Sequence, residues 1–298
     1  MYQQLIDDFI QREALPSSYA LDAGQWFLPL FSEIVESLRQ PKLHPLLVGI
    51  NGAQGTGKST LAGLLAAVLE AEQFTVATLS IDDFYLSKAR RQQLANEVHP
   101  LLASRGVPGT HDIDLALGKI RELVAAKAGT AVVLPSFDKA VDDCLTLEHC
   151  SCVEGPLDLI ILEGWFIGVG AQADADLQQP LNPLEELEDV DGYWRRYVNR
   201  QLAAGYQDLF AQFQLLIMLQ APQFEQVFEW RKLQEDKLRQ RSDANADGLM
   251  DDAQLKRFIQ HFERLTRHCL SSLPGKADVV FRLDSEHRVI GRDDLKKS

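Results

Sequence analysis

Short apolar runs alternate with longer segments of helical periodicity over most of the chain. The apolar runs predict strands at 46–50, 75–81, 131–134, 157–162, 214–219 and 278–283. The longer segments predict helices at 58–71, 112–127, 183–208, 222–241 and 252–271. This alternation favours an α/β fold with a mainly parallel sheet that is covered by helices on both faces. In such a sheet ligands bind beyond the carboxyl ends of the strands, so candidate chemistry is expected there.

The first 40 residues predict helices that pack beside this core. Their apolar positions recur at helical spacing and are Leu28, Leu30, Phe31, Ile34, Val35 and Leu38. Pro41 and Pro45 end the segment before the first strand. Because no repeat, low-complexity tract or Pro/Ser-rich linker divides the chain, we expect one domain over 1–298, with a helical extension at 1–45 and an inserted lid at 222–250.

A glycine-rich turn separates the first predicted strand from the helix after it. Its residues fit the pattern G-x-x-x-x-G-K-[ST] and are Gly52, Ala53, Gln54, Gly55, Thr56, Gly57, Lys58 and Ser59, followed by Thr60. Glycines let successive backbone N–H groups turn into one anion-sized hollow, and the helix N-terminus adds its positive end. We expect Lys58 to reach the β- and γ-phosphates of a nucleotide, and Ser59 to offer its hydroxyl to Mg²⁺.

Acidic residues follow two other predicted strands. Asp82 and Asp83 follow the second strand, where a carboxylate can accept the proton of an acceptor hydroxyl or hold Mg²⁺ through water. The alternative is an aspartate pair that caps a turn or the next helix. Glu163 follows the apolar run at 157–162, where a P-loop protein places the carboxylate linked to its metal. We therefore predict that Ser59, Glu163 and Asp82 surround Mg²⁺.

Two segments rich in turn residues are candidates for an acceptor pocket. Residues 105–112 contain Arg105, His111 and Asp112, and the segment 135–139 brings Lys139 to the end of the third predicted strand. Irregular segments of this kind build many substrate pockets. The alternative for the first segment is a solvated loop in which Asp112 caps the following helix.

Basic residues gather on the helix predicted at 222–241, although the whole chain is acidic. They are Arg231, Lys232, Lys237, Arg239 and Arg241. Cations that close over a triphosphate stabilise charge on the transferring group, so we predict that this helix belongs to a lid. The alternative is a solvated helix with i,i+4 pairs such as Arg231–Glu235. Arg267, on the next predicted helix, is a further candidate anion ligand.

Composition and charge argue against several partners. The 298 residues carry a net charge of −13, and duplex nucleic acid is disfavoured because binding to its backbone needs a basic surface. No run of about 18 apolar residues occurs, so we expect no membrane span. The N-terminal segment carries Asp7 and Asp8 where a signal peptide would carry basic residues, which predicts a cytoplasmic location.

A calcium-binding loop is matched only in part at 243–254. Asp243, Asn245, Asp247 and Gly248 fit the first half of an EF-hand loop. Position twelve is Gln254, whereas an EF-hand has a bidentate glutamate there. A polar turn between two helices accounts for the segment equally well.

Six segments occur in an order that is known from one enzyme family. After the phosphate loop come Ile81-Asp82-Asp83-Phe84-Tyr85, Arg105-Gly106-x-x-Gly109-x-His111-Asp112, Phe137-Asp138-Lys139, Glu163-Gly164-Trp165 and Trp230-Arg231. The order resembles that of the D-glycerate 3-kinases of plants and fungi and their bacterial relatives, over roughly residues 40 to 285. It is similar more broadly to phosphoribulokinase, uridine kinase and pantothenate kinase. The resemblance implies a P-loop NTPase-type three-layer sandwich that uses ATP and Mg²⁺ to phosphorylate a small hydroxylated metabolite.

The resemblance also implies roles for single residues. Asp82 is implied as the general base, Lys58 as a phosphate ligand, Glu163 as the acid near the metal and Arg231 as part of the lid. One departure concerns the acceptor. In the glycerate kinases the Phe-Asp-Lys segment continues into a glycine-rich stretch that ends Gly-Asp-Arg, whereas residues 140–144 read Ala-Val-Asp-Asp-Cys here. An arginine that could grip the substrate is therefore missing.

These expectations combine into a kinase that phosphorylates D-glycerate. The residues expected on the acceptor side are Asp83, Tyr85, Arg105, His111, Lys139 and Arg267. The carboxylate of glycerate should meet at least one cation, and Arg105, Arg267 and Lys139 are the candidates. The alternatives are a kinase for pantothenate, a nucleoside or a sugar phosphate, a nucleotide-gated switch or assembly ATPase without a small acceptor, and a calcium-binding module. The oligomeric state stays open.

Overall fold

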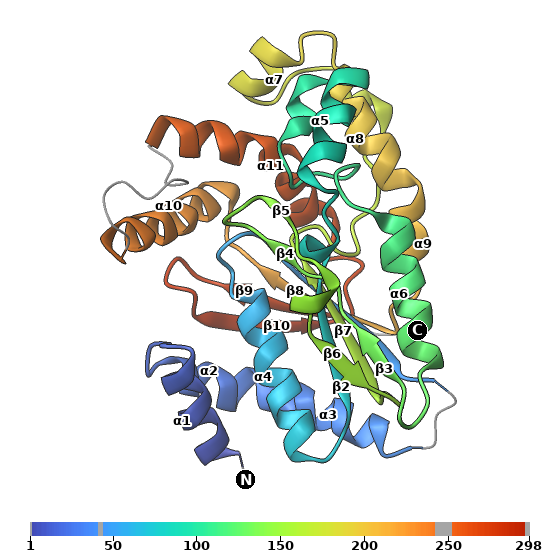
Figure 1. Cartoon of the computed structure of the whole chain (residues 1–298). Helices are drawn as coiled ribbons and strands as arrows, with labels where there is room; N and C mark the ends of the chain where they lie inside the picture. The colour runs from blue at the N-terminus through green and yellow to red at the C-terminus, as the bar shows by residue number, and fades with distance from the viewer. Residues whose placement is uncertain (1, 41–43, 242–251, 296–298) are drawn as a thin grey trace.

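A six-stranded sheet forms the centre of the chain. The computed structural model describes residues 2–40, 44–241 and 252–295, with side chains 234–241 excepted (Figure 1). Strands follow the order β10-β9-β8-β1-β7-β2, and every neighbouring pair is parallel except β9 and β10. Their bounds are β1 Leu46–Gly52, β2 Val76–Ser80, β7 Leu159–Gly164, β8 Leu215–Gln220, β9 Val279–Leu283 and β10 Val289–Asp294. The mainly parallel sheet predicted from the sequence is confirmed.

Two short hairpin-like sheets lie outside the central one. β3 (Ala131–Val133) pairs with β6 (Cys152–Glu154), and β4 (Phe137–Asp138) pairs with β5 (Asp143–Cys144), both antiparallel. The strand predicted at 131–134 therefore exists, but β6 and not the central sheet provides its partner. The sequence pattern identifies an extended segment and does not say which segment it pairs with.

Helices cover both faces of the central sheet (Figure 1). One buried cluster joins one face to α1 Gln3–Arg12, α3 Leu28–Leu38, α4 Lys58–Ala71 and α10 Phe224–Arg241. The other buried cluster joins the opposite face to α6 Ile113–Ala125, α8 Tyr193–Ala203, α9 Gly205–Phe210 and α11 Asp252–Ser272. Neighbouring strand residues divide between the clusters: Ile161 enters the first, and Ile160 and Leu162 enter the second. The three-layer P-loop architecture is thereby confirmed.

The remaining helices extend the two ends of the molecule. α2 (Tyr19–Asp22) lies with α1 and α3 at one end, and α5 (Lys88–Glu97) and α7 (Pro183–Glu188) lie with α8 at the other (Figure 1). The helical extension also contacts the turn between β9 and β10, because Asp22 accepts hydrogen bonds from the Arg288 guanidinium at 2.9 Å. The apolar stripe predicted for this extension is buried at Leu30, Phe31, Ile34 and Val35.

The helix predicted at 183–208 is wrong in one respect, because the structure divides it into α7, α8 and α9. Gly192 precedes α8 with φ 67°, a left-handed conformation that ends the helical path. The buried Asp189 carboxylate accepts hydrogen bonds from the backbone of Trp194 and Arg195 and so begins the new helix. Apolar periodicity continues through both breaks, which is why the pattern alone predicts a single helix.

Two predictions meet the limits of the described residues. The lid at 222–250 includes α10, but residues 242–250 lie outside the described residues, as do the side chains of Lys237, Arg239 and Arg241. The partial EF-hand match lies outside them too, except for its last residues at the start of α11. No helix in the described part of the chain is both long enough and apolar enough to cross a membrane.

Candidate active site

The phosphate loop connects the end of β1 to the first turn of α4. Gly55 and Gly57 have φ of 83° and 87°, a left-handed conformation that glycine adopts without strain. A Cβ on Gly52 would clash with the Thr56 hydroxyl. That hydroxyl donates a hydrogen bond to the Ala53 carbonyl at 2.8 Å and so closes the turn. The backbone therefore turns as a phosphate cradle requires, and it ends at a helix N-terminus that favours an anion.

Glu163 lies at the end of β7, between the strands that carry the phosphate loop and Asp82. Its Oε1 accepts a hydrogen bond from Ser59 Oγ at 2.7 Å, and its Oε2 lies 3.9 Å from Lys58 Nζ. The residue is only 6% exposed, and Oε2 has no hydrogen-bond donor among the described residues. A buried carboxylate oxygen that accepts no hydrogen bond, next to a serine hydroxyl, is suited to bind Mg²⁺, an ion that prefers oxygen ligands.

The described residues contain no group of three or more His, Cys, Asp or Glu side chains that could hold a metal by itself. A P-loop kinase does not need such a cage, since Mg²⁺ keeps several waters and shares ligands with the nucleotide phosphates. Ser59 and Glu163 would thus be ligands of the ion, which would neutralise phosphate charge there, and the predicted metal role of Asp82 stays a prediction.

Asp82 lies in the single 3₁₀ turn Ile81–Phe84 that follows β2. Its Oδ1 accepts a hydrogen bond from the Tyr85 hydroxyl at 2.8 Å, and its Oδ2 accepts one from Lys139 Nζ at 2.6 Å. Burial raises the pKa of Asp82, but the charges of Lys139 and Lys58 and the two hydrogen bonds outweigh burial, so that the net pKa is lowered. The carboxylate is held ionised, as a general base requires.

Asp83 adopts the capping role that the sequence left open for the pair. Its Oδ2 accepts a hydrogen bond from the backbone N–H of Ser80 at 3.2 Å, while Ser80 caps the turn in return. Its Oδ1 lies 3.5 Å from the Ser136 hydroxyl. Burial raises the pKa of Asp83, in the opposite direction to the pKa of Asp82. The capping interpretation therefore applies to Asp83, and the role of Asp82 as a base stays a prediction.

Tyr85 and His111 stack on each other behind Asp82. Their ring centroids are 4.5 Å apart, and both residues are buried. The Gly109 N–H donates to the Tyr206 hydroxyl at 2.9 Å, and the same hydroxyl shares a hydrogen bond with His111 Nδ1, also at 2.9 Å. Burial lowers the pKa of His111 to about 3, so the ring is neutral. Its Nε2 atom has no hydrogen-bond partner among the described residues.

Arg105 and Lys139 meet at the β4–β5 hairpin. Arg105 pairs with Asp142 and lies 5.5 Å from the centre of the Phe137 ring. Its guanidinium also donates to the carbonyl of Lys139 at 3.4 Å. The structure thus brings Lys139 to Asp82, while the guanidinium of Arg105 contacts the hairpin beside the site.

Comparisons with known proteins agree with this geometry. No protein-family model matches the chain. The uncharacterized kinase mug58 of Schizosaccharomyces pombe is 30% identical over 237 residues, which are 77% of this chain and 83% of that protein. The chain belongs to the family of P-loop kinases that includes D-glycerate 3-kinase. It is therefore a kinase-family protein, and its fold implies that it binds ATP.

Two relatives in this family are D-glycerate 3-kinases. The chloroplastic D-glycerate 3-kinase of Arabidopsis thaliana is 30% identical over 227 residues, 73% of this chain, and the chain spans 46% of that enzyme's length. The solved D-glycerate 3-kinase of Cryptococcus neoformans superposes with a TM-score of 0.74 at 25% identity, over 91% of this chain and 99% of that one. The structural superposition with this enzyme thus extends over almost the whole chain.

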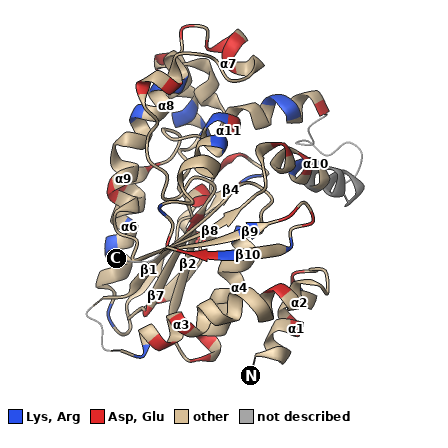
Figure 2. Cartoon of the chain, turned by 180° about the vertical axis from the view of Figure 1, so that it is seen from behind, with Lys and Arg blue, Asp and Glu red and all other residues tan. Residues whose placement is uncertain are grey.

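The kinase fold places the other predicted cations on α10 and α11. Figure 2 shows basic residues on α11, whereas α7 carries acidic ones. Arg267 donates to Glu263 at 2.9 Å and to Glu225 of α10 at 2.6 Å, so it ties the two helices together. Arg231 lies on α10, where its predicted role over the nucleotide remains a prediction.

Three residues that contribute to the kinase site could not be identified from the sequence motifs. Tyr206 orients His111, and Arg91 and Asp142 fix the hairpin that carries Lys139. Tyr206 and Arg91 lie within helices whose patterns contain no recognisable motif. Asp142 offered one signal, because it belongs to the segment where the chain departs from the glycerate kinases.

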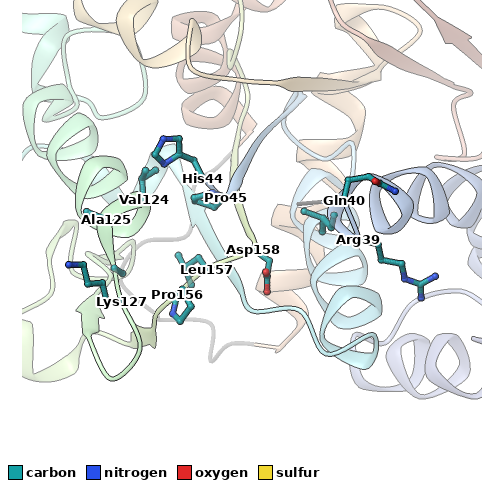
Figure 3. Close-up of a pocket in the computed structure, with 12 residues that line it drawn as sticks. Arg39, Gln40, His44, Pro45, Val124, Ala125, Lys127, Pro156, Leu157 and Asp158 are labelled. Carbon is teal, nitrogen blue, oxygen red and sulfur yellow. The ribbon is translucent and has the colours of Figure 1, made fainter. Parts of the chain in front are cut away.

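A cavity of about 620 Å³ lies at the end of the strands opposite to the phosphate loop. Figure 3 shows residues that line it. Pro45, which lines it, precedes β1, and Leu157 and Asp158 precede β7, so the cavity lies at the amino ends of the parallel strands. Ligands of open α/β sheets bind at the carboxyl ends, and the kinase residues lie there. Its volume alone therefore does not make this cavity the active site.

Proposed function

We propose that this kinase transfers the γ-phosphate of ATP to a hydroxyl of D-glycerate. The observation that carries the proposal is that three adjacent strands end in the required groups. β1 ends at the phosphate loop, β7 ends at Glu163 and β2 leads to Asp82. Parallel strands align their carboxyl ends, so the protein groups that would bind nucleotide, metal and acceptor lie at the same end of the sheet.

In this proposal Asp82 receives the proton of the acceptor hydroxyl as the oxygen bonds to the γ-phosphorus and ADP leaves. Its ionised state suits it to that role, and the Tyr85 hydroxyl fixes its orientation at 2.8 Å. Lys58 and the backbone N–H groups of the phosphate loop stabilise the charge that develops on the phosphoryl oxygens. Ser59 and Glu163 would hold Mg²⁺, which would neutralise charge on the phosphates.

D-glycerate carries a carboxylate, so the acceptor site should offer it a cation. Lys139 supports this choice because its ammonium lies 2.6 Å from Asp82, within reach of any acceptor that meets the base. Tyr85 and His111 form the wall of the proposed pocket, and the His111 Nε2 atom is left for a polar group of the acceptor. Arg105 and Arg267 keep their proposed anion roles only if substrate replaces the carboxylates that they contact.

An acceptor panel tests the proposed activity. ADP release is measured from the full chain with Mg²⁺-ATP and D-glycerate, pantothenate, uridine, ribulose 5-phosphate or no acceptor. Rapid release only with D-glycerate is the expected outcome. Rapid ADP release with another acceptor would reassign the substrate. Slow ADP release at the same rate with every acceptor and without one would favour the nucleotide-gated switch.

A further inference from the structure

Asp142 lies between two arginines in the turn of the β4–β5 hairpin. Its Oδ1 lies 2.9 Å from Arg91 Nη2 and also pairs with Arg105 Nη1. Arg91 is 1% exposed and donates to the backbone carbonyl of Asp142 at 2.8 Å as well. Hydrogen bonds between charged groups are stronger than neutral ones, so these contacts fix Asp142 firmly.

The backbone of Asp142 agrees with a position fixed by its surroundings. Its φ is 57°, a left-handed value that residues other than glycine adopt seldom and that costs free energy. Both guanidiniums also approach the ring of Phe137, in the first strand of the hairpin, at 5.7 and 5.5 Å from its centre. Both ends of the hairpin turn are therefore attached to Arg91 and Arg105.

This attachment determines where Lys139 can reach. Lys139 lies between Phe137 and Asp142, and its carbonyl accepts a hydrogen bond from Arg105 at 3.4 Å. Its ammonium bonds to Asp82 Oδ2 at 2.6 Å, although the side chain is 60% exposed. An exposed lysine has many rotamers, so a fixed backbone is needed to keep its charge beside one carboxylate.

We propose that Asp142 is a positioning residue that holds Lys139 beside Asp82, and that Lys139 selects acceptors with an anionic group close to the reacting hydroxyl. This inference rests on the proposed kinase function. An anionic acceptor gives the ammonium a new partner as the hydroxyl reaches Asp82. A neutral acceptor offers no such partner and must compete with Lys139 for the carboxylate.

The first test removes the charge of Lys139. The full chain and its Lys139→Met variant are assayed with D-glycerate and with its neutral methyl ester. The ratio of kcat/KM for the two acceptors should fall about tenfold or more, since a hydrogen bond between charged groups is lost. The KM for ATP should stay within about twofold. Lys139→Arg should keep most of the ratio, and Lys127→Met, which changes an exposed lysine far from the site, should keep all of it.

The second test releases the hairpin. Asp142→Asn keeps a side chain of equal size that tolerates the left-handed backbone, but it removes the charge. Amide hydrogen exchange in residues 137–144 should rise about tenfold while β1 and the phosphate loop stay unchanged. The KM for D-glycerate should rise, whereas the KM for the methyl ester and for ATP should not.

The outcomes separate this inference from the proposed function. If none of the acceptors in the panel supports ADP release by the wild-type chain, both the kinase proposal and the acceptor selection by Lys139 are overturned. An active wild type whose Lys139→Met variant keeps its preference for the anionic acceptor would overturn the selection alone. Unchanged exchange in Asp142→Asn would overturn the positioning role, whatever the acceptor is.

Discussion

Asp82 and Asp83 illustrate how neighbouring identical residues take different roles. Asp83 accepts a backbone hydrogen bond from Ser80 and closes a capping box, whereas Asp82 meets the side chains of Tyr85 and Lys139. The pKa of Asp83 is raised by burial, and the pKa of Asp82 is lowered because two cations outweigh burial. Geometry and charge thus agree that Asp82 is the member suited to proton transfer.

Asp82→Asn should remove the base without removing the nucleotide site. We expect kcat to fall about 10²–10⁴-fold, the range that general base catalysis contributes. Binding of Mg²⁺-ATP, measured by calorimetry, should change little because the phosphate loop is intact. Turnover near that of the wild type would contradict the assignment of Asp82 as the base.

The pH dependence of activity should report Asp82 and not His111. Asp82 works ionised, and its lowered pKa keeps it ionised as pH falls below the range of ordinary aspartates. The groups that face it are Lys139, Lys58, Tyr85, Asp83 and His111. Lys139→Met should raise the pKa of Asp82, so the acidic limb of kcat/KM should move to higher pH. An acidic limb that stays in place would mean that another group controls it.

At the scale of elements, glycines decide how the loops approach the helices. The segment 105–112 reaches the site through Gly106, whose φ is 136° and whose missing side chain makes room for Phe262 of α11. The Trp165 indole then donates to the Gly106 carbonyl at 3.1 Å, linking this segment to the end of β7. Gly106 therefore allows this segment to pack closely against α11.

Gly106→Ala should destabilise the chain, because the added methyl group would clash with Phe262 and the backbone conformation is unfavourable for alanine. We expect a loss of about 1–3 kcal/mol in the free energy of unfolding, measured in urea. Gly24→Ala is the matched control, since a Cβ there meets nothing within 4 Å, and its effect should stay within about 1 kcal/mol. Equal effects of the two substitutions would argue against close packing at Gly106.

At the scale of the whole molecule, buried ion pairs join segments that are distant in the sequence. Glu185 of α7 is fully buried and accepts hydrogen bonds from Arg264 of α11 at 2.7 and 2.5 Å. Arg264 also donates to the carbonyls of Asp176 and Gln179, so one guanidinium connects three segments. These contacts fix the upper end of the molecule, where α5, α7 and α8 lie (Figure 1).

Glu185→Ala should leave the charge of Arg264 buried without its partner. The expected loss in the free energy of unfolding is about 3–5 kcal/mol, the cost of breaking a buried pair by removing one member. Glu186→Ala, next to it on the exposed side of α7, should change stability by less than about 0.5 kcal/mol. Similar urea midpoints for both variants would show that the Glu185–Arg264 pair contributes little.

The sequence by itself determined the parts of this protein that depend on local patterns. The phosphate loop, the apolar strands and the acids that follow them could be predicted because each is a short segment in which residue type dictates backbone shape or burial. Tertiary structure alone decided the contacts between such segments. Lys139 and Asp82 are 57 positions apart, and Arg91 and Asp142 are 51 apart, so no local pattern records either pair. Their meeting depends on strand order and on the path of a hairpin, which only packing of the whole chain establishes.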